Sequence, residues 1–222
     1  MDALTRALVE STLAVFEPPD PVLEIGSLQV QGEQVGDLRP LFADKTFVGC
    51  DMMPGDGVDL VGRIESLPVP DAWAGTVLCL NVLEHAWECR RGVTELRRVT
   101  AEGGLALVTA PFTFHIHAYP DDYWRFTPRA LARLMEGFPS VLVGWQGHHK
   151  TPRVVFALGL NEVRTDLPDV AEAWRRETLM RWAERPPLLK RLRAAVGGTL
   201  FGKRGWRHVS HWRDLAVEVA RG

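Results

Sequence analysis

Short apolar runs alternate with amphipathic stretches along most of this chain. The apolar runs predict strands, because each is short and ends at a polar or turn-forming residue. The predicted strands cover residues 21–26, 46–50, 58–61, 76–80, 105–110, 141–145 and 154–160. Apolar residues at helical spacing predict helices over 2–16, from Cys89 to a glycine cap at Gly103, and over 128–137, with weaker helical character at 33–43.

This order of elements predicts an α/β fold. Strands that alternate with helices form a doubly wound, mostly parallel sheet, which here has seven strands. No helix separates the last two strands, so we expect them to form an antiparallel edge hairpin. The predicted parts are a helix packed on the core (1–20), a core domain (21–164) and a helical, arginine-rich extension (165–222).

The C-terminal extension differs in composition from the core. Its apolar spacing predicts helices over 169–184 and 211–220, separated by proline and glycine-rich segments. Basic residues outnumber acidic ones in the extension. The extension is therefore interpreted as a lid over a pocket, a docking segment or a contact in a homodimer.

Bulk properties exclude several classes of protein. The chain has 222 residues, 46% of them hydrophobic, and a net charge of −2, which disfavours bulk binding of nucleic acid. We expect no signal peptide, because residues 2–16 are amphipathic, and no membrane span, because no apolar stretch is long enough. The three cysteines have no metal-binding spacing and predict reduced thiols in a cytoplasmic protein.

The first predicted strand ends in a turn that suits a nucleotide-like ligand. Glu24 lies two residues before Gly26, and the turn at Gly26 and Ser27 exposes backbone N–H groups past the end of the strand. Such a turn beside an acid suits the cationic end of an amino acid better than a pyrophosphate. Asp51, at the tip of the second strand, is placed to accept hydrogen bonds from ribose hydroxyls or to cap a turn.

Residues 112–126, directly past the fifth strand, concentrate polar and aromatic side chains. His115 and His117 have the spacing of one strand face, so they could act as general bases, hold a metal with Asp121 or Asp122, or serve a structural role. Arg125 is expected to form a buried ion pair with one of the two aspartates.

Taken in order, these motifs resemble those of class I S-adenosylmethionine-dependent methyltransferases of the type-11 group, over about residues 20–160. Residues 24–27 correspond to the first motif, Asp51 to the acid after the second strand, and 81–85 to the motif after the fourth. Residues 63–68 occupy the stretch that wraps the adenine.

Two positions depart from the pattern of that family. Leu28 replaces a glycine in the first motif, so the approach of the cofactor to the backbone can differ locally. Arg63 stands where an acid commonly contacts the adenine. That substitution leaves a backbone contact from Ile64 in place of a side-chain contact.

The resemblance implies a set of site residues. Those expected to bind S-adenosylmethionine, or its product S-adenosylhomocysteine, are Glu24, Gly26, Ser27, Asp51, Met52, Ile64, Glu65, Asn81 and Val82. Those expected to bind the methyl acceptor are Phe114, Tyr119, Tyr123, Trp124 and Arg125. The expected catalytic residues are His117, His115 and Asp121, and no metal is expected because members of this group generally need none.

The function implied is transfer of a methyl group to an oxygen, nitrogen or carbon atom of a small molecule. The aromatic loop favours a sugar-bearing or cyclic metabolite. The alternatives are a non-catalytic partner or scaffold with the same fold, suggested by Leu28 and Arg63, and a nucleic-acid methyltransferase, suggested by the basic extension. A nicotinamide-dependent oxidoreductase is disfavoured because the first turn lacks the glycine spacing for a pyrophosphate.

Overall fold

The structure is a computed structural model that describes residues 2–29, 36–117, 121–182, 188–189, 192, 196 and 211–220. The strands are β1 (Val22–Ile25), β2 (Phe47–Asp51), β3 (Leu60–Val61), β4 (Ala74–Leu80), β5 (Thr100–Pro111), β6 (Ser140–His148), β7 (Thr151–Leu160) and β8 (Leu215–Val219). The α-helices are α1 (Ala3–Phe16), α2 (Cys89–Val99), α3 (Pro128–Leu134) and α4 (Leu167–Arg181), and two short 3-10 helices are η2 (Arg39–Phe42) and η3 (Leu83–His85).

The strands form one sheet in the order β3-β2-β1-β4-β5-β7-β6-β8. The first five strands in this order pair in parallel, and the last four pair antiparallel, with β5 belonging to both groups. The α/β prediction is confirmed, as is the antiparallel hairpin of β6 and β7. Because β1 pairs with both β2 and β4, the carboxyl ends of these three strands lie at the same edge of the sheet.

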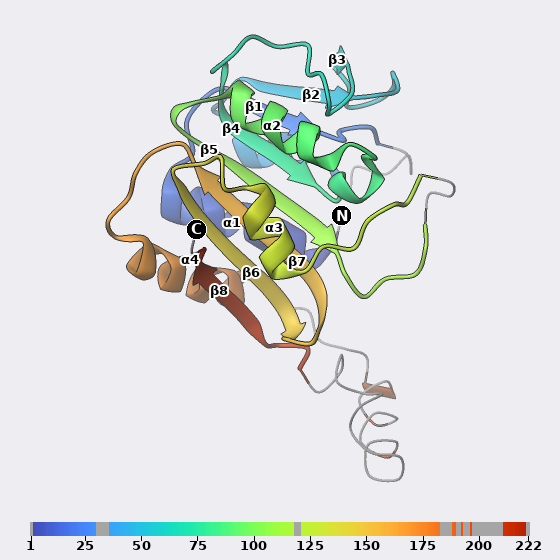
Figure 1. Ribbon diagram of the computed structural model, residues 1–222, viewed down its shortest axis with the longest axis vertical. Coiled ribbons are helices and arrows are strands. Elements are labelled where there is room, and N and C mark those ends of the chain that lie inside the picture. The colour runs from blue at the N-terminus through green and yellow to red at the C-terminus, as the bar shows by residue number, and fades with distance from the viewer. Residues whose placement is uncertain are drawn as a thin grey trace.

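Side chains alternate between two cores on opposite faces of the sheet. In β5, Ala106 and Val108 face the core that α2 and α3 cover, whereas Leu105 and Leu107 face the core covered by α1 and α4. Figure 1 shows α2 and α3 on the near face of the sheet and α1 behind it. Both faces of the central strands are therefore buried, which explains their nearly continuous apolar sequences.

The helices α1 and α4 pack against each other behind the sheet. Asp2 caps α1 by accepting a hydrogen bond from the Thr5 N–H at 2.8 Å. The hydroxyls of Ser11 and Thr178 form a buried hydrogen bond of 2.7 Å between the two helices. None of the helices in the described part of the chain is long and apolar enough to cross a membrane.

The prediction of a helix over 211–220 is wrong. Residues Leu215–Val219 form β8, which pairs with β6, so the sheet has eight strands and β6 is not its edge. Leu215, Val217 and Val219 alternate with smaller or polar residues and join the core behind the sheet. This two-residue period, together with the free edge of β6, decides for a strand over a helix.

Two predicted helix ends are also wrong. The helix α2 ends at Val99, and Gly103, with a φ of 71°, lies within β5 instead of capping the helix. The helix α3 ends at Leu134, three residues short of the prediction. Of the weak helix predicted at 33–43, only the turn Arg39–Phe42 forms among the described residues, and 33–35 lie outside them.

We predict that Trp174→Ala will lower the free energy of unfolding by about 3–5 kcal/mol. The Trp174 ring is fully buried, with its centroid 6.0 Å from that of Phe16 in α1 and 5.5 Å from that of Phe156 in β7. Its Nε1 has no hydrogen-bond partner in the described part of the chain, so Trp174→Phe should cost only about 1–2 kcal/mol. Urea denaturation measures both, and equal losses would contradict this packing.

Candidate functional site

The turns that follow β1 and β4 touch at the edge of the sheet. Gly26 has a φ of 80°, and a Cβ atom added to it would lie 2.5 Å from Cγ2 of Val82. The Gly26 N–H donates to the carbonyl of Cys50 at 2.9 Å, which ties the same turn to β2. Only glycine fits at position 26, and its lack of a side chain lets three strand ends form one surface.

Asp51 connects the turns after β1 and β2. Its carboxylate accepts hydrogen bonds from the backbone N–H groups of Leu28, at 3.2 Å, and Met53, at 3.0 Å. Met52, between Asp51 and Met53, is exposed. The carboxylate therefore organises two loops at the end of β2, where the sequence predicts contacts with ribose and adenine.

Glu24 and Asn81 lie on either side of this junction. Burial raises the pKa of Glu24 to about 8, while Arg39 opposes the rise and Asp37 adds to it. Asn81 directly follows β4 with a φ of 57°, and its N–H donates to the Thr109 carbonyl at 2.9 Å. Glu24 is therefore mostly uncharged in the free protein at neutral pH, and a cationic ligand bound beside it would favour its ionised form.

The segment expected to wrap the adenine forms a turn. Arg63 and Ser66 make an isolated β-bridge, and Nε of Arg63 lies 3.4 Å from a carboxylate oxygen of Glu65. The Ile64 side chain is buried against Gly92 of α2. Because that side chain belongs to the core, only the backbone of Ile64 is available to a ligand.

Past β5, an ion pair organises the loop that the sequence marks as the acceptor side. Arg125 donates to both carboxylate oxygens of Asp122, at 2.5 and 2.8 Å, and the Asp122 side chain is buried. Arg125 and the other donors hold the pKa of Asp122 far below its usual value. The expected ion pair is confirmed, with Asp122 as the partner of Arg125.

His117 is held beside the same carboxylate. Its backbone N–H donates to Oδ2 of Asp122 at 2.8 Å, and its ring atom Nδ1 lies 3.1 Å from that oxygen. The rings of Phe114 and His117 make a T-shaped contact, with 5.1 Å between their centroids. The ring of His117 therefore presents Nε2 away from Asp122.

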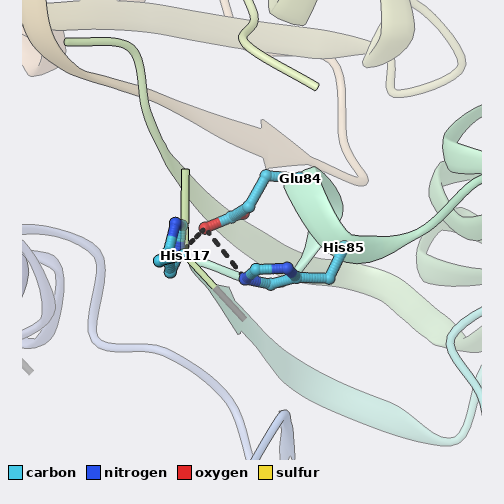
Figure 2. Close-up of side chains that lie close together, drawn as sticks. All are labelled: Glu84, His85 and His117. Carbon is cyan, nitrogen blue, oxygen red and sulfur yellow. Dashed lines mark ion pairs between the residues drawn. The ribbon is translucent and has the colours of Figure 1, made fainter. Parts of the chain in front are cut away.

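Glu84, in η3, lies beneath this ring. Its side chain is fully buried, and neither carboxylate oxygen has a hydrogen-bond partner in the part of the chain that the structure describes. Figure 2 shows Oε1 of Glu84 facing Nε2 of His85, at 3.8 Å, and Nε2 of His117, at 4.0 Å. Burial raises the pKa of Glu84 to about 7.

The side chains of two of the three residues predicted to be catalytic lie apart from this cluster, although the Asp121 carbonyl accepts from Nδ1 of His85 at 2.6 Å. The carboxylate of Asp121 accepts a hydrogen bond from the Tyr123 hydroxyl at 2.5 Å, and the carboxylate beside His117 is that of Asp122 instead. His115 is exposed and stacks on Phe114 with 4.3 Å between ring centroids.

The aromatic residues predicted to bind the acceptor are divided between surface and core. Phe114 and Tyr123 are exposed, whereas Trp124 stacks on Trp87 and donates from Nε1 to the Ala86 carbonyl at 3.0 Å. Tyr119 lies outside the described residues.

Sequence reasoning did not single out Glu84 or His85 as site residues, and it named Asp122 only as an alternative to Asp121 as a metal ligand or as the partner of Arg125. The signal available in the sequence was the pair Glu84-His85 shortly after a buried strand. This pair was interpreted only as part of the family motif at 81–85. Their convergence with His117 depends on the fold of 121–125, because the Tyr123 and Trp124 N–H groups donate to the Glu84 carbonyl at 2.8 and 3.2 Å.

Comparison with known proteins relates part of the chain to a methyltransferase family. Residues 23–108 match the family model described as "Methyltransferase domain" of the type-11 group. A probable S-adenosylmethionine-dependent methyltransferase from Mycolicibacterium smegmatis is 40% identical over 50 residues, which are 22% of this chain and 20% of that protein. The match thus spans about a fifth of the length of this curated relative.

Solved structures share the fold. One is the 1,6-didemethyltoxoflavin-N1-methyltransferase of Burkholderia thailandensis, crystallised with 1,6-didemethyltoxoflavin and S-adenosylhomocysteine. It is 16% identical with a TM-score of 0.53, and covers 72% of this chain and 79% of that one. Another, a SAM-dependent methyltransferase from Archaeoglobus fulgidus, is 15% identical with a TM-score of 0.52, and covers 70% and 94%. Residues 23–108 of the chain thus match a methyltransferase domain of the type-11 group, and the chain shares its fold with solved S-adenosylmethionine-dependent methyltransferases.

Proposed function

We propose that this protein is an enzyme that transfers a methyl group from S-adenosylmethionine to a small-molecule acceptor. The observation that carries the proposal is the junction of three strand ends, where Gly26 packs on Val82 and Asp51 holds the Leu28 amide. At such a junction, open α/β sheets bind nucleotide-like ligands. Although Leu28 replaces a glycine of the family motif, its backbone N–H still donates a hydrogen bond to Asp51.

The cofactor residues have distinct proposed roles. When bound, S-adenosylmethionine supplies a methyl group on a sulfonium, whose carbon–sulfur electron pair stays on sulfur as the acceptor's lone pair forms the new bond. Glu24 pairs with the ammonium, while Gly26, Ser27, Asn81 and Val82 line the methionine side. The remaining contacts are to ribose and adenine, from Asp51, Met52 and the backbone of Ile64 and Glu65.

The acceptor is proposed to bind against the loop that follows β5. Phe114 and Tyr123 are exposed there, and the ring of His117 packs against that of Phe114, which supports a role for His117 in handling the acceptor proton. The Burkholderia thailandensis enzyme was crystallised with a small molecule, which supports a small-molecule acceptor here. Tyr119, Trp124 and Arg125 remain predicted acceptor residues, and a homodimer contact through 165–222 remains a prediction.

A cytoplasmic location is part of the proposal. Cys50, Cys79 and Cys89 are all free and buried. Unpaired buried thiols support a reducing compartment.

We predict that S-adenosylhomocysteine will bind the purified protein and that NAD will not. Asp51→Ala should weaken the binding of S-adenosylhomocysteine by more than about tenfold, because a charged acceptor of the ribose hydroxyls is lost. Isothermal titration calorimetry measures both affinities.

The control for this variant is Asp51→Asn, which keeps an oxygen for the Leu28 or Met53 amide and should bind more tightly than Asp51→Ala. Circular dichroism checks that both variants are folded. Unchanged affinity in folded Asp51→Ala would remove the ribose assignment, and failure of the native protein to bind would overturn the proposed function.

We predict that binding of S-adenosylhomocysteine will release a proton near neutral pH. The pKa of Glu24 in the free protein is about 8, so this carboxyl is mostly protonated at about pH 7. An approaching ammonium favours the ionised form and lowers this pKa. Affinity should therefore rise as pH increases from about 6 and level off above the free-protein pKa of about 8.

Calorimetry in buffers of different ionisation enthalpy counts the protons released. Glu24→Gln should bind more weakly, with no release and a flat pH dependence over the same range. The same release in Glu24→Gln would mean that another group titrates.

We predict that His117→Ala will lose methyl transfer while it binds S-adenosylhomocysteine as tightly as the native protein does. His117 lies past β5, on the proposed acceptor side, whereas the proposed cofactor residues lie within or after β1, β2, β3 and β4. His149→Ala, in the exposed turn between β6 and β7, is the matched control and should keep full turnover. Turnover is measured as S-adenosylhomocysteine formed with an acceptor found by screening, and full activity in His117→Ala would leave this residue a structural role only.

A further inference from the structure

Three ligand atoms from two separate segments converge beside the end of β4. They are a carboxylate oxygen of Glu84 and the Nε2 atoms of His85 and His117, and all lie within 4.8 Å of one another. Glu84 and His85 come from η3, whereas His117 comes from the loop after β5 (Figure 2). Two chain segments that are separate in the sequence thus supply one cluster of potential metal ligands.

A partner on the far side of the His85 ring fixes which of its nitrogens carries a hydrogen. Nδ1 of His85 lies 2.6 Å from the Asp121 carbonyl, which can only accept, so Nδ1 donates to it. Nδ1 of His117 lies 3.1 Å from Oδ2 of Asp122 but makes no hydrogen bond in the described part of the chain. The Nε2 atoms of both rings face Glu84. A histidine whose other nitrogen donates to a carbonyl, as in His85, is a usual form of histidine metal ligand.

Glu84 lacks the donor that a buried carboxylate needs. Its side chain is fully buried, and both of its oxygens lack a hydrogen-bond partner in the described part of the chain. The histidine nitrogens, at 3.8 and 4.0 Å, are too distant to donate hydrogen bonds to it. Ligands about 2.0–2.2 Å from one shared ion lie ~3.0–3.5 Å apart, so small side-chain rotations suffice to close the cluster on a cation.

We propose that Glu84, His85 and His117 bind a first-row divalent transition metal ion of the zinc or manganese kind, and that the methyl acceptor is an oxygen nucleophile bound to that ion. Two imidazoles with one carboxylate suit these ions, whereas magnesium and calcium prefer oxygen ligands alone. Three protein ligands leave at least one coordination position for the acceptor.

The acceptor part of this proposal rests on the proposed function and narrows it to O-methylation. A divalent cation lowers the pKa of a hydroxyl that it coordinates. The hydroxyl gives its proton to water, its oxygen lone pair forms the bond to the methyl carbon, and the carbon–sulfur electron pair remains on sulfur as a thioether. In this role His117 holds a metal ion in place of a proton.

Cobalt and zinc titrations of the full-length, chelator-treated protein test the site without any acceptor. Co²⁺ bound by nitrogen and oxygen ligands absorbs visible light, and calorimetry with Zn²⁺ gives affinity and stoichiometry. We expect one site in the native protein, and a loss of affinity of at least about tenfold in Glu84→Gln, His85→Ala and His117→Ala. His115→Ala, two residues from His117 and outside the cluster, is the matched control and should bind metal as the native protein does.

The outcomes separate the metal site from the proposed function. No Co²⁺ binding, or equal binding in the three cluster variants and in His115→Ala, overturns the metal site. Binding of S-adenosylhomocysteine to the same metal-free protein is measured in parallel. If S-adenosylhomocysteine does not bind, the proposed function is overturned, whereas the metal titration still decides on the metal site. Circular dichroism confirms folding, and Glu84→Gln preserves the shape of the buried side chain if the histidine variants unfold.

The oxygen assignment has its own readout. Catechols and sugar diols should sharpen or shift the Co²⁺ spectrum of the native protein, and amine analogues of the same shape should not. A spectrum that responds equally to both would overturn the oxygen assignment and leave the metal site.

Discussion

The close approach of the turns after β1 and β4 is the constraint on which the rest of the site depends. It requires position 26 to have no side chain, because a Cβ there would lie 2.5 Å from Val82. Parallel pairing of β1 with β4 fixes the register, and Ile25 lies opposite Cys79 just before the two turns. As a result, the turn expected to face the cofactor and the segment that carries Glu84 form one continuous unit. A shift of either strand would displace both.

The loop after β5 is fastened to this unit through the backbone of Glu84. The Tyr123 and Trp124 N–H groups both donate to the Glu84 carbonyl, so two donors satisfy its main chain while its side chain has none in the described part of the molecule. The Trp124 indole adds a bond to the Ala86 carbonyl. Residues 121–125 of this loop are thereby positioned by η3, and the His117 N–H, which donates to Asp122, holds His117 beside Glu84.

Much of the fold follows from the sequence because local pattern and tertiary environment agree in the central strands. Runs such as 105–110 are apolar on both faces, and the structure buries both faces. The segment 211–220 was mispredicted because a short amphipathic stretch fits either period, and only the free edge of β6 selects the strand. Local spacing carries no information about such an edge.

The site was predictable only in part, for a related reason. Gly26 and Asp51 follow strand ends, and the topology alone brings strand ends together. The neighbours Asp121 and Asp122 are equivalent in sequence, yet Asp122 is buried on Arg125 while Asp121 contacts Tyr123. Their different roles depend on the path of the loop, which pattern does not encode. The burial of Glu84 likewise depends on 121–125 folding over it.

The charges in this cluster argue that it is built to hold a cation. Glu84 and Asp122 are two buried carboxylates, and Arg125, paired with Asp122, is the one arginine joined to either by an ion pair in the described residues. His85 donates outward through Nδ1 to the Asp121 carbonyl, and the Nε2 atoms of both histidines, at 3.8 and 4.0 Å, lie too far from Glu84 to donate to it. A buried site with an excess of acceptors over donors is stable only when a proton or a metal ion is shared among them. The Nε2 atoms of both histidines already face the carboxylate, and a metal ion satisfies all three groups at once, whereas a single proton satisfies at most two.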